Sequence, residues 1–250
     1  MKTVKLAYQD IFKGNLIVVN EKYPYRENNV EADLEQIKII DTYISLKRPI
    51  ATLLMKILDE ISGRQSVFAV SGWRSFREQK KIYDQSLKEN GVSFTRKFVA
   101  LPGHSEHQTG LAVDLGLRTD TIDFIRPAFP YAGICQSFRE KAVQYGFIER
   151  YPKNKELITG IAHEPWHFRY VGIPHAEIMT KQNLCLEEYA EFIKEYPYGE
   201  RACHYNAGRQ SIAVSYIKAD SGGAQFEIAE DILYSISGNN MDGYIIAEWR

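Results

Sequence analysis

The pattern of the chain changes near Pro197, and this change limits the folds open to it. Before Pro197, stretches with helical spacing alternate with short β-prone runs, whereas the segment after it holds only short β-prone runs separated by turn-rich clusters. We expect helices at 49–62, 76–90, 138–145 and 186–196, and strands at 66–70, 111–115, 166–172, 211–218, 224–229, 232–237 and 244–249. The sequence therefore predicts an α+β domain over residues 1–197 and a β-rich C-terminal appendix over residues 198–250.

Two of the expected helices have clear end signals. In the stretch 49–62, apolar residues recur at helical spacing, Pro49 suits a first turn and Gly63 suits a C-terminal stop. The stretch from Ser75 to Glu78 fits a capping box, in which the two side chains bond each other's backbone amides. A helix is thus expected from Phe76 to about Asn90, ending at Gly91.

Charge and hydropathy exclude several classes of function. Lys and Arg number 31 against 32 Asp and Glu, so the chain lacks the basic excess of a nucleic-acid-binding protein. The apolar run at 16–19 is too short for a signal-peptide core, and no later segment approaches the length of a membrane span. We expect a soluble, cytoplasmic protein with no nucleic-acid or membrane partner. A homodimer is one option that the sequence leaves open.

Four of the six histidines lie in two short stretches, 103–114 and 163–167, together with carboxylates. A catalytic zinc ion takes three nitrogen or oxygen ligands and keeps one position open for water. The two stretches supply atoms of the right kind, and two different zinc sites can be drawn from them.

The first site uses the H-E-x-x-H pattern of His163 and His167, with Glu187 as a third ligand. That pattern works on a helix, where residues i and i+4 share a face. Here Pro165 interrupts the turn at a cost of about 3 kcal/mol, and the residue before a proline is pushed toward extended geometry. In a regular strand the two histidines would lie roughly 13 Å apart, which one metal cannot span without a bend.

The second site takes His107, Asp114 and His167 as ligands and leaves Glu164 free to act as a base. The scarcity of cysteine is compatible with either site, because neither uses a thiolate. The three cysteines are far apart and lack a C-x-x-C pair, which argues against a cysteine metal site and a disulfide framework.

Three motifs in order resemble the zinc D-Ala-D-Ala peptidases, which include the VanX, VanY and bifunctional VanXY enzymes. They are Ser71 to Ser75 (with Trp73 where the family usually has tyrosine), the run Ser105-x-His107-x-x-Gly110-x-Ala112-x-Asp114, and Glu164 to His167. The resemblance covers about residues 10–196, and the appendix resembles the extra segment of the longer VanXY proteins. The resemblance implies an α+β fold with a central, mainly antiparallel sheet between helices.

The resemblance also assigns roles to residues. It implies Zn²⁺ bound by His107, Asp114 and His167, with Glu164 as the catalytic base and Arg74 as the stabiliser of the transition state. Ser105 and Gln79 match positions near the substrate. Zinc activates water and polarises a carbonyl, a neighbouring carboxylate moves the proton, and a guanidinium stabilises the oxyanion.

The implied function is a zinc D,D-peptidase that hydrolyses D-Ala-D-Ala or removes the terminal D-Ala of a peptidoglycan precursor, which links it to glycopeptide resistance. The substrate would be a small peptide or a peptidoglycan precursor. Three alternatives stay open: an L-Ala-D-Glu endopeptidase on the same scaffold, a non-catalytic zinc-binding module, and the H-E-x-x-H protease described above.

Overall fold

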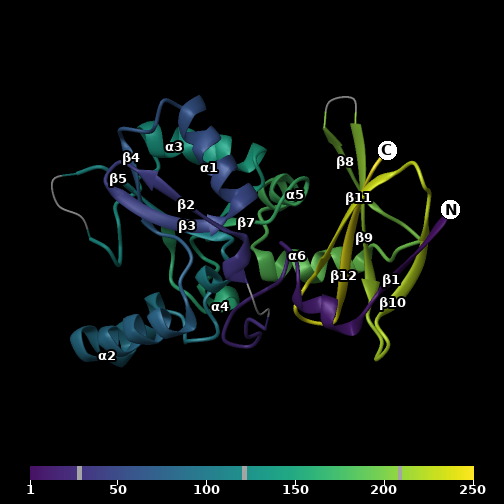
Figure 1. Cartoon of the computed structure of the whole chain (residues 1–250), viewed down its shortest axis with the longest axis horizontal. Helices are drawn as coiled ribbons and strands as arrows, with labels where there is room; N and C mark the ends of the chain where they lie inside the picture. Colours follow the sequence, from purple (N-terminus) through teal and green to yellow (C-terminus); the bar gives the residue numbers. More distant parts are fainter. Residues whose placement is uncertain (27–29, 120–122, 208–209) are drawn as a thin grey trace. The chain divides into compact units, whose positions relative to one another are not determined.

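The computed structural model describes residues 1–26, 30–119, 123–207 and 210–250, and it divides into two compact units (Figure 1). The larger unit comprises Val19–Thr180, and the smaller unit comprises Met1–Val18 together with Lys181–Arg250. This division does not coincide with the predicted boundary at 197/198. The reason is that the first strand pairs with a strand of the C-terminal segment, so both ends of the chain belong to one unit. The boundary at 197/198 stays a prediction.

The larger unit is built on a four-stranded sheet in which every neighbouring pair is antiparallel. Its strands, in spatial order, are β4 (Val67–Ser71), β5 (Ala112–Leu117), β7 (Glu164–Tyr170) and β6 (Phe147–Tyr151). A separate antiparallel hairpin is formed by β2 (Leu34–Ile39) and β3 (Thr42–Lys47). The expected α+β class and the mainly antiparallel sheet are confirmed.

The hydrophobic core of the larger unit lies between one face of this sheet and two helices, α1 (Arg48–Glu60) and α3 (Gly133–Gln144). Helix α1 forms because its apolar residues fall on one stripe that is buried, with Pro49 in its first turn. In β5, Val113 and Leu115 belong to the core, so Asp114 between them points to the opposite face. The polar site described below lies on that opposite face.

Helix α2 (Phe76–Phe98) begins at the predicted capping box: the Ser75 hydroxyl accepts from the Glu78 amide at 3.2 Å. At Gly91 the backbone has a φ of +78°, so two helical segments meet there. The predicted helix end at Gly91 thus corresponds to a break rather than to the end of the element. The remaining helices are α4 (Glu156–Thr159), α5 (His175–Gln182) and α6 (Leu186–Phe192). None of the helices in the described ranges has the length and apolar character of a membrane span.

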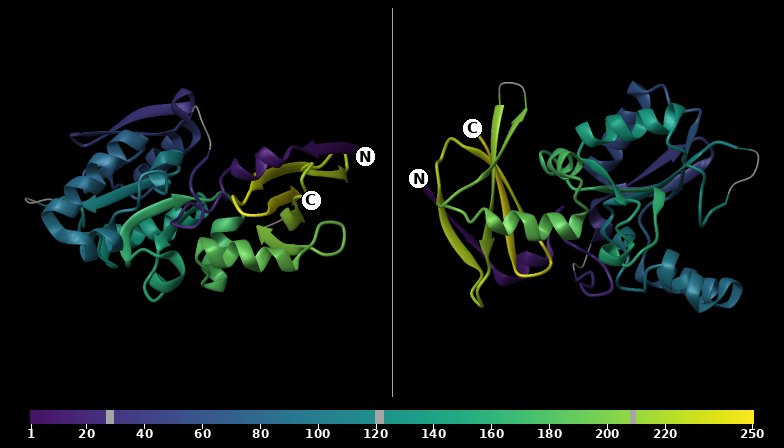
Figure 2. Two further views of the ribbon diagram at one scale, coloured as in Figure 1. Left: turned by 90° about the horizontal axis from the view of Figure 1, so that it is seen from below. Right: turned by 180° about the vertical axis from the view of Figure 1, so that it is seen from behind.

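The smaller unit is rich in strands, as predicted for the appendix (Figure 2). An antiparallel sheet has the spatial order β11 (Leu233–Gly238), β12 (Gly243–Trp249), β9 (Gln210–Lys218) and β8 (Cys203–Ala207). A second antiparallel pair joins β1 (Lys2–Leu6) to β10 (Ala224–Ile228). Phe226, Ile228 and Ile246 form a buried cluster between these strands. The pairing of the two chain ends depends on long-range register and has no local sequence signal.

Candidate functional site

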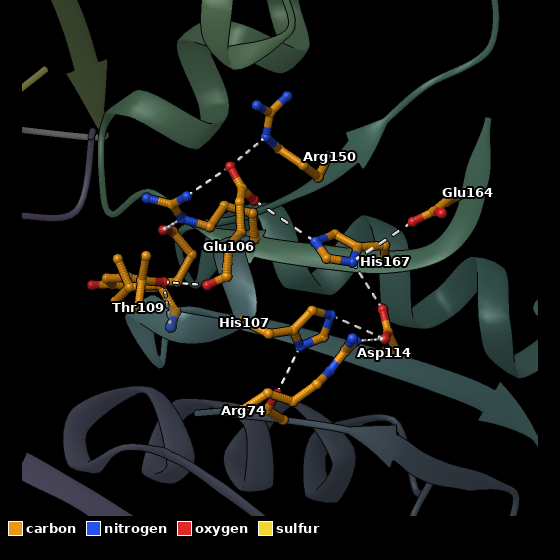
Figure 3. A network of polar contacts seen from close by, with 12 residues as sticks. Arg74, Glu106, His107, Thr109, Asp114, Arg150, Glu164 and His167 are labelled. Atoms are coloured by element: carbon orange, nitrogen blue, oxygen red, sulfur yellow. Dashed lines mark hydrogen bonds and ion pairs between the residues drawn. The ribbon is translucent and has the colours of Figure 1, made fainter. Parts of the chain in front are cut away.

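Asp114 and His167 lie directly opposite each other on the neighbouring strands β5 and β7. Residues paired in this way place their side chains on the same face of a sheet, close enough to interact. The Asp114 Oδ1 atom lies 2.8 Å from His167 Nδ1 (Figure 3). The sheet register therefore joins two residues that are 53 positions apart in the sequence.

A bulge in β7 brings Glu164 to the same side as His167. Tyr151 pairs with Glu164 and Glu149 pairs with Phe168, so β7 has two more residues than β6 between these pairs. Residues i and i+3 of a regular strand point to opposite faces, but a bulge re-aims one of them. Glu164 Oε2 lies 3.8 Å from His167 Nδ1 as a result.

The same bulge explains the proline inside the motif and excludes the helical zinc site. Pro165 lacks an amide donor, and a bulge is one of the few places in a sheet that tolerates it. Residues 164–170 form a strand rather than a helix. The Nε2 atom of His163 lies 2.7 Å from the Tyr131 hydroxyl, and His163 is absent from the cluster of possible metal ligands among the described residues.

His107 lies on a short 3-10 helix, η3 (Glu106–Thr109), just before β5. Its ring orientation is fixed because Nδ1 lies 2.7 Å from the Gly72 carbonyl oxygen, which turns Nε2 to within 3.0 Å of Asp114 Oδ2. Gly110 links η3 to β5 with a φ of +70°, and an added Cβ would lie 3.1 Å from the Leu34 side chain. Glycine adopts this conformation without strain.

His107, Asp114 and His167 each offer one ligand atom, and these atoms all lie within 4.8 Å of one another. All three residues are buried. Two imidazoles and one carboxylate form the kind of donor set that holds a catalytic zinc ion and leaves a coordination position open. The residues present thus fit a zinc ion.

Arg74 lies just before α2 and reaches into this cluster. Its guanidinium donates to Ser71 Oγ at 2.9 Å, to Gln79 Oε1 at 2.9 Å and to Asp114 Oδ2 at 3.1 Å. A guanidinium has a planar fork of donors, and three acceptors in different directions hold that plane in one orientation. Arg74 therefore presents a fixed positive charge beside the possible metal ligands.

The structure places the other two predicted residues, Gln79 and Ser105, at the same cavity. Gln79 is only 1% exposed, and its side-chain amide donates to the Ala100 carbonyl at 2.7 Å while its oxygen accepts from Arg74. Ser105 is 3% exposed and precedes η3. The geometry gives Gln79 a direct role in orienting Arg74.

Burial and close charges shift the pKa values of the clustered groups. Burial raises the pKa of Glu164 to about 8 and, together with the Arg74 charge, lowers the pKa of His107 to about 4. Burial also disfavours the charged form of His167, but the Asp114 carboxylate outweighs it and raises the pKa of His167 to about 9. Against its own burial, the two histidines hold the pKa of Asp114 well below its usual range.

Glu106 is a buried residue that the sequence reasoning did not single out. Its Oε1 atom accepts from Arg150 Nε at 2.7 Å and lies 2.8 Å from Arg169 Nη1. The side chains of all three residues have zero exposure, and the two arginines outweigh the burial of Glu106 and lower its pKa. The available signal was Arg169, which lies inside the predicted strand 166–172 among aromatic residues, because a charge is rarely buried unless it is paired.

The predicted site residues and Glu106 line a cavity of about 340 Å³ in the larger unit. One part of its lining is polar and includes Arg74, Asp114, Glu164 and His167. Another part is apolar and is formed by Ile82, Phe98, Phe124, Ile125, Ile161 and Trp166. A concave site with convergent polar groups beside an apolar wall is typical of small-ligand sites.

Comparison with known proteins gives concordant matches. The VanY model, described as D-alanyl-D-alanine carboxypeptidase, matches residues 44–173, more than half of the chain. The bifunctional D-Ala-D-Ala dipeptidase and carboxypeptidase VanXYC of Enterococcus gallinarum is 39% identical over 183 residues, covering 73% of this chain and 96% of that protein.

Two solved structures extend these matches. The vancomycin resistance D,D-dipeptidase VanXYg, in complex with a D-Ala-D-Ala phosphinate analogue, has a TM-score of 0.95 and 51% identity, covering 100% of this chain and 99% of that chain. A mutant of the D,D-pentapeptidase VanY from a VanB-type resistance cassette, in complex with Zn(II), has a TM-score of 0.56 and 33% identity. The match covers 70% of this chain and 98% of that chain. The family resemblance expected from the three motifs is confirmed: the chain belongs to the VanY family of D-alanyl-D-alanine carboxypeptidases.

Proposed function

We propose that the chain is a zinc-dependent D,D-peptidase that hydrolyses D-Ala-D-Ala and removes the terminal D-Ala of peptidoglycan precursors, an activity linked to vancomycin resistance. One observation carries the proposal: His107, Asp114 and His167 converge within 4.8 Å in a cavity that Glu164 and Arg74 also line. The names of the relatives, which include a dipeptidase, a carboxypeptidase and a Zn(II) complex, support the same reaction and metal.

In this proposal His107, Asp114 and His167 hold the zinc ion. Zinc, when bound, supplies a Lewis acid that polarises a carbonyl group and acidifies water. One carboxylate ligand leaves the site with a net charge of about +1, which retains that acidity.

Glu164 is the general base in this proposal. Glu164 is 5% exposed, and its Oε2 atom lies 3.8 Å from His167 Nδ1, beside the possible metal ligands. A carboxylate in this position takes the proton of the water and passes it to the leaving amine. Burial raises the pKa of Glu164, which makes its carboxylate a stronger base toward the water proton.

Arg74 stabilises the developing oxyanion in this proposal. Its guanidinium is held by Ser71, Gln79 and Asp114 before substrate arrives, so little reorganisation is needed in the transition state. Ser105 and Gln79 complete the wall of the cavity beside the substrate. The resemblance to the VanXY enzymes supports a cytoplasmic location for the protein, where D-Ala-D-Ala and nucleotide-linked precursors are its substrates.

The test compares three substrates with zinc-loaded protein: D-Ala-D-Ala, a muramyl pentapeptide ending in D-Ala-D-Ala, and a peptide with an L-Ala-D-Glu bond. We expect D-Ala release from at least one of the first two, loss of activity with a chelator, and recovery with zinc. Glu164→Gln should retain zinc and lose activity. Cleavage of the L-Ala-D-Glu peptide alone would make the endopeptidase alternative correct, and full activity of Glu164→Gln would exclude Glu164 as the base.

A further inference from the structure

The two histidines present different ring nitrogens to the possible metal site. In His107, Nδ1 faces the Gly72 carbonyl oxygen, which only accepts, so Nδ1 carries the proton and Nε2 is available to a metal. In His167 the ring is reversed: Nδ1 faces Asp114 and Glu164, and Nε2 faces away from them toward Glu106 (Figure 3). His167 therefore needs a hydrogen-bond acceptor at Nε2 to offer its Nδ1 lone pair to a metal.

Glu106 supplies that acceptor. Its Oε1 atom is occupied by Arg150 and Arg169, so its other oxygen, Oε2, is left for His167 Nε2. The two atoms are 3.7 Å apart, and both are buried without a hydrogen-bond partner among the described residues. A normal N–H···O bond is about 2.9–3.0 Å, so a movement of less than about 1 Å joins two groups that are costly to leave apart.

The surroundings hold Glu106 in this orientation. The Thr109 hydroxyl donates to the Glu106 carbonyl oxygen at 2.6 Å, which fixes the backbone of η3. The two buried arginines fix one carboxylate oxygen and so prevent the group from rotating. A carboxylate held in this way imposes one ring orientation and one tautomer on a metal-binding histidine.

We propose that Glu106 is a positioning residue for the metal site: it accepts from His167 Nε2 and so directs His167 Nδ1 to the zinc ion. The inference rests on the zinc site of the proposed function. It assigns a role to the buried group of Glu106, Arg150 and Arg169, which has no role in the proposed reaction itself. It also predicts that the two histidines bind zinc through different atoms, His107 through Nε2 and His167 through Nδ1.

Glu106→Gln is the most direct test because it preserves the size of the side chain. The two arginines only donate, so the amide oxygen of the new side chain must face them and its NH₂ group must face His167. That NH₂ group donates to Nε2 and drives the His167 proton to Nδ1, the atom that zinc needs. We expect zinc affinity, measured by competition with a chromophoric chelator, to fall by about 10–100-fold.

Glu149→Gln is the matched control. Glu149 pairs with Arg139 at 2.8 Å and is mostly buried, but it contacts none of the three possible ligands. We expect both variants to lose stability, because each removes the negative charge from a buried ion pair. The zinc affinity of Glu149→Gln should nevertheless stay within about twofold of that of the starting protein. An equal loss of affinity in both variants would show a general effect of losing a buried ion pair and would overturn the proposal.

Nitrogen-15 NMR of the histidine rings in the unsubstituted, zinc-loaded protein gives a second readout that needs no variant to fold. We expect His167 to have zinc at Nδ1 and a proton at Nε2, and His107 to have the reverse. Zinc at His167 Nε2 would overturn the proposal. If the protein binds zinc and releases D-Ala but Glu106→Gln binds zinc normally, only this inference fails; if the protein does not bind zinc, the proposed function fails with it.

Discussion

Arg74→Lys separates a catalytic role of Arg74 from a structural one. The guanidinium reaches three acceptors at 2.9–3.1 Å: Ser71, Gln79 and Asp114. Lysine keeps the positive charge but concentrates it on one nitrogen, which cannot take the place of Nε, Nη1 and Nη2 together. The substitution therefore removes the fixed orientation while it retains the charge.

The structure gives two magnitudes for this variant. Gln79 is 1% exposed, so the loss of the donor to its Oε1 leaves a buried acceptor unpaired at a cost of about 1–3 kcal/mol in the free energy of unfolding. If the guanidinium also stabilises the oxyanion, the loss of one aligned donor lowers kcat by about 10²–10³-fold. A structural role predicts the first effect alone.

The assay measures D-Ala release from D-Ala-D-Ala at saturating zinc, and urea unfolding followed by circular dichroism gives the stability. Arg77→Lys is the control, because Arg77 is an exposed residue in the first turn of the same helix. We expect this control to change neither quantity. A kcat of Arg74→Lys within about threefold of the starting enzyme, with reduced stability, would refute the catalytic role.

Three further outcomes test the fold. Gly110→Ala should lower the free energy of unfolding by about 1–2 kcal/mol in urea titrations, because its φ of +70° strains any residue with a Cβ; unchanged stability would contradict this. Burial lowers the pKa of His175 to about 3, so its contribution to stability is present above about pH 6.5 and is lost as the pH falls toward 3. In His175→Gln, the slope of the free energy of unfolding against pH should fall by up to about 1.4 kcal/mol per pH unit in that window. An unchanged slope would show that His175 does not titrate on unfolding. Limited proteolysis tests the predicted boundary at 197/198: a stable fragment 1–197 would support it, whereas joint release of both chain ends would support the two units of the structure.

Local sequence signals were sufficient for much of the larger unit. The helical stripe of α1, the capping box at Ser75 and the strand that contains Asp114 all follow from spacing within one segment. The motif order was also sufficient to select His107, Asp114 and His167, which the fold brings together.

The features that sequence reasoning missed depend on pairing between distant segments. Strand β1 has no signal for its pairing with β10, some 220 residues later. The burial of His175 was missed in the same way, because no local pattern places this residue inside the protein. Glu106 was overlooked because its meaning depends on Arg150 and Arg169, which lie on two other elements. A charged residue in a buried segment becomes interpretable only when its partner is known.

The H-E-x-x-H stretch shows why spacing can support two opposite interpretations. On a helix the two histidines would share a face, whereas in a regular strand His167 would share a face with His163 and not with Glu164. Pro165 excludes the helix but also disfavours a central strand, since it has no amide to donate. A bulge satisfies both constraints: it accommodates the proline and turns Glu164 to the side of His167, leaving His163 to contact Tyr131. The proline that rules out one zinc site is therefore part of the geometry that builds the other.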